Sequence, residues 1–148
     1  MRIALLLLFV CTLSSVRSDE VITSFLQEQQ ILSRQFPAIE KELASLPTCL
    51  PPEQKHILFA ITHFFDNKVH RHLQQEEKVA HSSDHIAYEN KLLTQWIVNI
   101  QNSVNVEKME IDSFITQSQG LLEALKRHFA AVEEATSCLK IDVTQGKS

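Results

Sequence analysis

The chain of 148 residues has few of the residues that end helices or build tight turns, with Gly 2 and Pro 4. An antiparallel sandwich or barrel needs a tight turn after almost every strand, and those turns depend on glycine. Hydrophobic residues make up 44% of the chain, which is too many for a disordered or collagen-like protein. The sequence therefore favours a single helical domain.

Positive charge is also scarce, because Lys+Arg 14 stand against Asp+Glu 18, for a net charge of −4. Proteins that bind nucleic acid usually carry a basic patch, so we expect no nucleic-acid partner. No apolar run reaches the length of about 20 residues that crosses a bilayer. We therefore expect no membrane span in the mature chain.

Motifs of common enzymes are missing. The sequence holds no glycine-rich phosphate loop, no Gly-x-Ser-x-Gly turn and no His-Glu-x-x-His helix. Neighbouring acidic residues, such as Glu76 with Glu77 and Glu133 with Glu134, are interpreted as solvated helix surface. We expect no catalytic residue, no cofactor and no enzymatic activity.

The first residues have the layout of a secretory signal peptide. A basic start is followed by the apolar run 3–13, IALLLLFVCTL, and then by a short polar stretch ending at Ser18. Val16 and Ser18 occupy the −3 and −1 positions of a cleavage site. The pattern predicts a signal peptide over 1–18, an extracellular mature chain over 19–148, and a frayed polar tail over 142–148.

The rest of the sequence predicts helices over about 20–46, 52–80, 84–104 and 105–140. Apolar residues recur at steps of three and four in each segment, and no alternating strand pattern occurs. Pro37 lies within the first segment, where we expect a kink. Residues 46–52 hold three of the four prolines and predict a stiff turn. The fold class is all-α, a bundle of three or four helices.

Cysteine usage indicates one disulfide. Cys11 would leave with the signal peptide, so Cys49 and Cys138 would most simply pair with each other in an oxidising compartment. The rival interpretations are a disulfide between two chains and a free thiol. In an up-down four-helix bundle, three antiparallel helices lie between Cys49 and Cys138 in sequence. An odd number of helices places the two cysteines at opposite ends of the bundle, too far apart for a disulfide. An internal disulfide therefore requires an irregular bundle or a last helix broken near Gly120.

Histidine recurs at every seventh position, at His56, His63 and His70, which forms one stripe on a helix. With Asp66 between them, His63, Asp66 and His70 are the candidate ligands of a divalent metal. The stripe lies opposite the apolar side of its helix, so a solvated polar face is the favoured interpretation. Protonation of several histidines would also make the charge sensitive to mildly acid pH.

Phe59 departs from the apolar pattern because it lies beside the histidine stripe. It would either be covered by another helix or offer an exposed apolar contact to a partner. His56, Phe59 and His63 are therefore the candidate partner-binding residues.

Two non-catalytic functions remain, and neither fixes the oligomeric state. The first is a secreted signalling or modulatory factor that acts through protein–protein interaction. The alternative is an extracellular carrier of fatty acids or other small apolar ligands in a helical cavity. The candidate cavity residues are the aromatics Phe64, Phe65, Trp96, Phe114 and Phe129, although filling an ordinary core is the simpler role for them.

Overall fold

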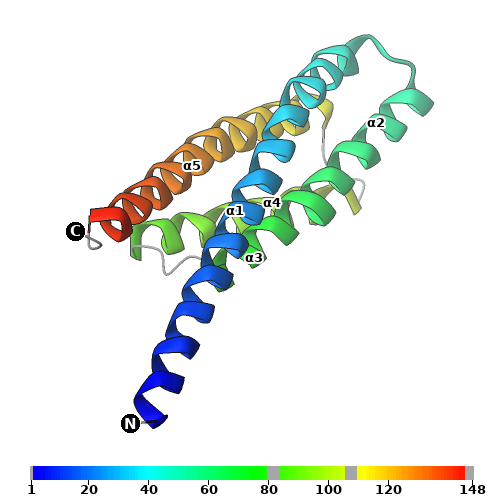
Figure 1. The fold of residues 1–148 in the computed structure, drawn as a ribbon. Coiled ribbons are helices and arrows are strands. Elements are labelled where there is room, and N and C mark those ends of the chain that lie inside the picture. The colour runs from blue at the N-terminus through cyan, green and yellow to red at the C-terminus, as the bar shows by residue number, and fades with distance from the viewer. Residues whose placement is uncertain (1, 80–83, 106–109, 146–148) are drawn as a thin grey trace.

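In the computed structural model, the described part of the chain is built from helices and contains no strand (Figure 1). The structure describes the backbone of residues 2–79, 84–105 and 110–145, and the side chains of 20–78, 84–104 and 110–137. The five α-helices are α1 (Arg2–Ser45), α2 (Pro51–His63), α3 (His70–Val79), α4 (Asp84–Asn105) and α5 (Ile111–Gln145).

These helices make four passes. The π-helical segment η2 (Phe64–Val69) joins α2 to α3 without a turn, so the three elements form the second pass. Passes next to each other in sequence run in opposite directions, and α1 packs against both α3 and α5 (Figure 1). The predicted all-α bundle is confirmed, with four passes.

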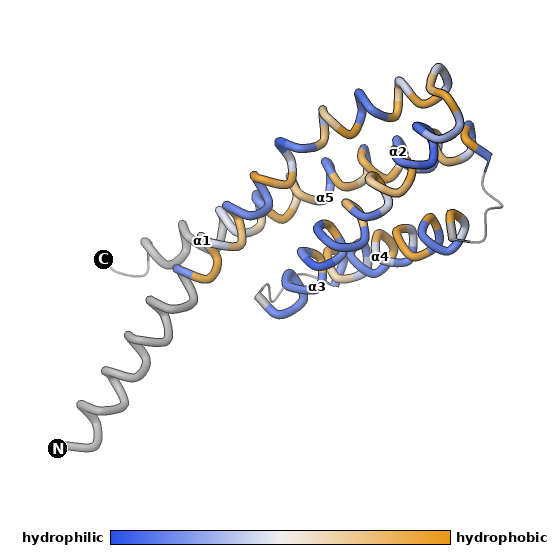
Figure 2. The backbone as a smooth tube through the Cα atoms, turned by 90° about the vertical axis from the view of Figure 1, so that its right-hand side faces the viewer, coloured by the Kyte–Doolittle hydropathy of each residue, from blue (hydrophilic) through white to orange (hydrophobic). Residues whose placement is uncertain are grey.

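The core lies between the four passes and is filled by the apolar stripes that the sequence predicted. Hydrophobic and hydrophilic residues alternate along each helix, as expected for amphipathic helices (Figure 2). The largest fully buried side chains come from all four passes: Phe36, Leu43, Leu46, Ile61, Phe65, Leu73, Ile97, Ile100, Phe114, Leu121, Leu122 and Leu125.

Pro37 lies inside α1 and does not end it, so the helix is unbroken at this position. The chain reverses instead at the predicted turn, where the short 3₁₀ helix η1 (Leu46–Thr48) follows α1. The Gln54 side chain donates a 2.9 Å hydrogen bond to the Leu46 carbonyl across this turn. Proline at the first position of α2 costs no hydrogen bond, because the first turn of a helix leaves its N–H groups unpaired.

The predicted break near Gly120 was wrong, since α5 continues through it. A Cβ atom built on Gly120 would lie 3.1 Å from the ring of Trp96, which comes from α4. Glycine is therefore used here for close packing between two helices rather than for ending one. Glycine in a helix lowers stability by about 1 kcal/mol relative to alanine. At position 120 its lack of a side chain leaves room for the Trp96 ring.

Gly120→Val is expected to destabilise the protein by about 1–3 kcal/mol, the usual cost of overpacking. The added methyl groups would displace the Trp96 ring. Thermal unfolding measures the loss, and the emission of Trp96, the single tryptophan, reports the displacement. An unchanged melting temperature together with an unchanged emission spectrum would show that the close approach of Trp96 to Gly120 does not constrain the packing of α4 on α5.

The expected internal disulfide is not seen in the described residues. Cys49 is a free cysteine whose thiol lies 3.3 Å from the Ser45 carbonyl oxygen, and the side chain of Cys138 lies outside the described residues. Lys126 pairs with Glu40, and further along α5 the Phe129 carbonyl accepts a hydrogen bond from Gln29, which lies earlier on α1. The two helices therefore run antiparallel, which places Cys49 and Cys138 towards opposite ends. The stretch of α5 from Lys126 to Cys138 alone spans about 18 Å, whereas bridged Cα atoms lie about 5–6 Å apart.

The signal peptide predicted over 1–18 falls on residues whose side chains lie outside the described set, and the backbone of 2–18 belongs to α1. The tail expected to fray from 142 is helical up to Gln145, and 146–148 lie outside the described residues. Among the residues that the structure describes, no helix is both long enough and apolar enough to cross a membrane.

Candidate functional site

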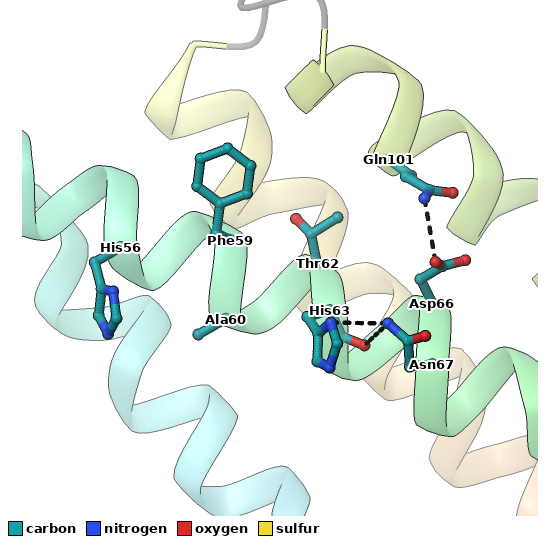
Figure 3. Close-up of a pocket in the computed structure, with 8 residues that line it drawn as sticks. All are labelled: His56, Phe59, Ala60, Thr62, His63, Asp66, Asn67 and Gln101. Carbon is teal, nitrogen blue, oxygen red and sulfur yellow. Dashed lines mark hydrogen bonds between the residues drawn. The ribbon is translucent and has the colours of Figure 1, made fainter.

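The three partner-binding candidates lie together on an exposed face of α2. They line a groove of about 410 Å³, which we call the α2 groove; Figure 3 shows it, with Gln101 of α4 at its far end. The lining residues are His56, Phe59, Ala60, Thr62, His63, Asp66, Asn67 and Gln101.

Phe59 is the largest apolar side chain that lines this groove, and it is 50% exposed. Of the two interpretations of Phe59, the structure therefore supports an exposed contact rather than a ring covered by another helix. His56 and His63 are exposed as well, which agrees with the predicted solvated histidine face. An aromatic ring held half out of the core offers a partner apolar area without requiring the helix to move.

Hydrogen bonds order the polar end of the groove. The Asn67 amide donates to Nδ1 of His63 at 2.8 Å and to the His63 carbonyl oxygen at 3.3 Å. Asp66 accepts a 3.1 Å hydrogen bond from Gln101 and so connects η2 to α4. The side chains that a partner would meet at this end are therefore held in place before binding.

The metal candidates His63, Asp66 and His70 do not converge. Asp66 lies 3.6 Å from Nδ1 of His70, whereas His63 is bonded to Asn67 instead. A π-helical turn contains more residues than an α-helical turn, so η2 shifts His70 away from the predicted stripe. No group of three His, Cys, Asp or Glu side chains that would hold a metal ion occurs in the described part of the chain.

A buried ionic cluster, which the sequence did not predict, lies between α3, α4 and α5. Nε2 of His128 lies 2.9 Å from a carboxylate oxygen of Glu76, and Nδ1 lies 3.1 Å from Glu89. We call Glu76, Glu89 and His128 the His128 cluster. The Glu76 side chain is only 1% exposed, so its interpretation as solvated surface was wrong.

Both nitrogens of His128 face carboxylates, and this arrangement favours the charged ring. Burial acts against the charge, but the hydrogen bonds and negative charges of Glu76 and Glu89 outweigh it, so the pKa of His128 is raised above its ordinary value of 6.5. A signal for this cluster was present in the sequence. His128 continues the stripe of Leu121 and Leu125 on α5, and a charged residue in an apolar stripe indicates a buried partner.

His72 is a second buried histidine, and its surroundings favour the neutral ring rather than the charged one. Its ring stacks on Phe25 with 4.4 Å between centroids, and neither ring nitrogen makes a hydrogen bond. Glu28 approaches Nδ1 only to 3.9 Å, which is beyond hydrogen-bond length. Burial therefore lowers the pKa of His72 below 6.5, although the charge of Glu28 acts in the other direction. From its place beside Val69 and Leu73, the sequence predicts that His72 is a buried histidine with satisfied hydrogen bonds. The burial is confirmed, but the prediction of satisfied hydrogen bonds is wrong.

Four of the five cavity candidates are core residues. Phe64, Phe65, Phe114 and Phe129 are at most 5% exposed and belong to one continuous apolar core. Phe36 packs against two of them, with centroids 6.3 Å from Phe64 and 5.8 Å from Phe129. The fifth candidate, Trp96, is half-buried at the surface of α4. The four phenylalanines therefore fill an ordinary core, which was the simpler of the two interpretations.

Comparison with protein-family models, with curated proteins and with solved structures finds no match.

Proposed function

We propose that this is a secreted, non-enzymatic helical protein that acts by binding another protein through the α2 groove. The exposure of Phe59 is the observation that carries the proposal. Aromatic side chains are enriched among the residues that contribute most to protein–protein affinity, and they act best where polar groups surround them. His56, His63 and Asn67 supply such a polar rim.

Two hydrogen bonds at the polar end of the groove support the same proposal. The bonds from Asn67 to His63 and from Gln101 to Asp66 fix the polar side chains before a partner arrives. Less side-chain entropy is then lost on association, which raises affinity. The partner that fits this face presents an apolar side chain over Phe59 and polar groups that hydrogen-bond to His56 and His63.

The alternative function, a carrier with an internal apolar cavity, receives no support from its candidate residues. Phe64, Phe65, Phe114 and Phe129 pack against other core side chains. A ligand in the interior would have to displace these rings from the core, and removing a buried aromatic side chain from its packing costs about 3–5 kcal/mol. Protein binding is therefore the function that we propose.

Phe59→Ala is expected to weaken partner binding by about tenfold or more, because it removes the largest apolar side chain that lines the groove. The wild-type chain, immobilised, is used to capture proteins from the extracellular fluid of the cells that secrete it. Captured proteins are then quantified by mass spectrometry against the same chain carrying Phe59→Ala.

Tyr88→Ala is the matched control, because Tyr88 is an aromatic residue on α4 that is 61% exposed and lies outside the α2 groove. A true partner is retained by Tyr88→Ala and lost from Phe59→Ala, while circular dichroism confirms that both variants are folded. Equal retention by the two variants would contradict the assignment of the α2 groove.

A further inference from the structure

A second groove lies between α4 and α5 and is distinct from the α2 groove. It has a volume of about 370 Å³, within the range of about 300–1,000 Å³ typical of small-molecule sites. We call it the α4–α5 groove. Its lining residues are Glu89, Leu92, Leu93, Trp96, Ala124, Arg127 and His128.

One end of this groove is apolar. Leu92 and Leu93 both line the groove, and Leu92 is 51% exposed whereas Leu93 is buried. The Trp96 ring lies close against Gly120, and the small side chain of Ala124 leaves space beside it. A hydrocarbon chain placed here would cover apolar surface that is now in contact with water, which favours binding.

The other end is polar, and a cation is available there. Glu89 lies 3.1 Å from His85 and 3.1 Å from His128, so both of its oxygens already face histidines. Arg127 is exposed and makes no ion pair or hydrogen bond within the described residues, although it lies within electrostatic reach of Glu123. The group left to meet a ligand is therefore a guanidinium, which recognises a carboxylate with two parallel hydrogen bonds.

We propose that the α4–α5 groove binds one alkyl carboxylate, with the chain along Leu92, Trp96 and Ala124 and the carboxylate on Arg127. The site lies on the surface, and its only member among the five predicted cavity residues is Trp96. It is also independent of Phe59, so a failure of this site leaves the proposed protein-binding function untouched.

Dodecanoate, kept below its micelle concentration, is the probe. Titration into the full chain is expected to give a saturable change in the emission of Trp96, the single tryptophan, and a matching isotherm by titration calorimetry. Dodecanol, which has the same chain without the charge, is expected to bind about fivefold more weakly. Arg127→Gln is expected to weaken dodecanoate binding by the same factor and to leave dodecanol binding unchanged.

Leu92→Asp is expected to weaken dodecanoate binding at least about tenfold, by removing apolar wall and adding negative charge beside the chain. The fold tolerates this change because Leu92 is half exposed. Arg71→Gln, at an exposed position on α3 outside the groove, is the matched control and leaves affinity unchanged. The proposal is overturned if neither emission nor calorimetry saturates, or if Arg127→Gln binds dodecanoate as tightly as the wild type does.

Discussion

Replacing His128 with leucine is expected to lower the free energy of unfolding by about 3–5 kcal/mol, the usual cost of removing one partner from a buried ion pair. The substitution leaves the Glu76 carboxylate 1% exposed without the nitrogen that lies 2.9 Å from it. Glu89 is affected less, because its side chain is 34% exposed and it also contacts His85. Denaturant unfolding followed by Trp96 emission measures the loss.

The double variant Glu76→Leu with His128→Leu separates the two contributions. Replacing both partners of a buried pair by apolar residues is often close to neutral. We therefore expect the double variant to recover most of the stability that His128→Leu loses. If the double variant is less stable than His128→Leu alone, the cluster contributes through packing and not through charge.

The two buried histidines also predict how stability depends on pH. His128 has a raised pKa, so its contribution is fully present below the unfolded value of 6.5 and is lost as the pH rises through its folded pKa. His72 has a lowered pKa, so its contribution is fully present above 6.5 and is lost as the pH falls through its folded pKa. The two histidines therefore favour a maximum in the free energy of unfolding near pH 6.5. In the double variant Glu76→Leu with His128→Leu, the free energy of unfolding should no longer decline above this pH.

Phe36→Ala is expected to cost about 3–5 kcal/mol of the free energy of unfolding, because it opens a cavity in the centre of the core. Phe36 is 1% exposed and contacts the rings of Phe64 and Phe129. Since total stabilities are about 5–15 kcal/mol, this single change would remove a large share. Chemical denaturation at pH 6.5 measures it.

Ile31→Ala is the matched control on the same helix, because Ile31 is 56% exposed. Surface substitutions of this kind usually change stability by less than about 0.5 kcal/mol. Similar losses for Phe36→Ala and Ile31→Ala would contradict the placement of the two faces of α1.

Helical periodicity was enough to predict the four long helical segments of this fold. In the predicted helix over 20–46 the apolar residues Phe25, Leu32, Phe36 and Leu43 recur at steps of three and four, with Gln29 in the one polar slot, and all four are buried. The proline-rich turn ends α1 close to the predicted position. The exposed face of α2 was predicted for the same reason, since residues opposite an apolar stripe meet water. The spacing of apolar residues along each helix determines these features, so they can be predicted from one sequence.

Features that depend on another helix could not be predicted in this way. Glu76 and His128 lie 52 positions apart, so the apolar stripe on α5 marks His128 as buried, but its partner is identified only when α3 is placed beside α5. Gly120 indicated a break because the sequence does not show the Trp96 ring that occupies its space. The π-helical segment η2 likewise moved His70 off the predicted stripe, because the period changes within the helix.

Photo-crosslinking at position 59 is the sharpest test of partner binding through the α2 groove. A benzophenone amino acid replaces Phe59 in one chain and Tyr88 in a control chain, and each is irradiated with the extracellular fluid of the secreting cells. We expect a crosslinked protein at position 59 that is absent at position 88 and is displaced by excess wild-type chain but not by excess Phe59→Ala. The same crosslinked proteins at both positions, or none at position 59, would contradict binding through this groove.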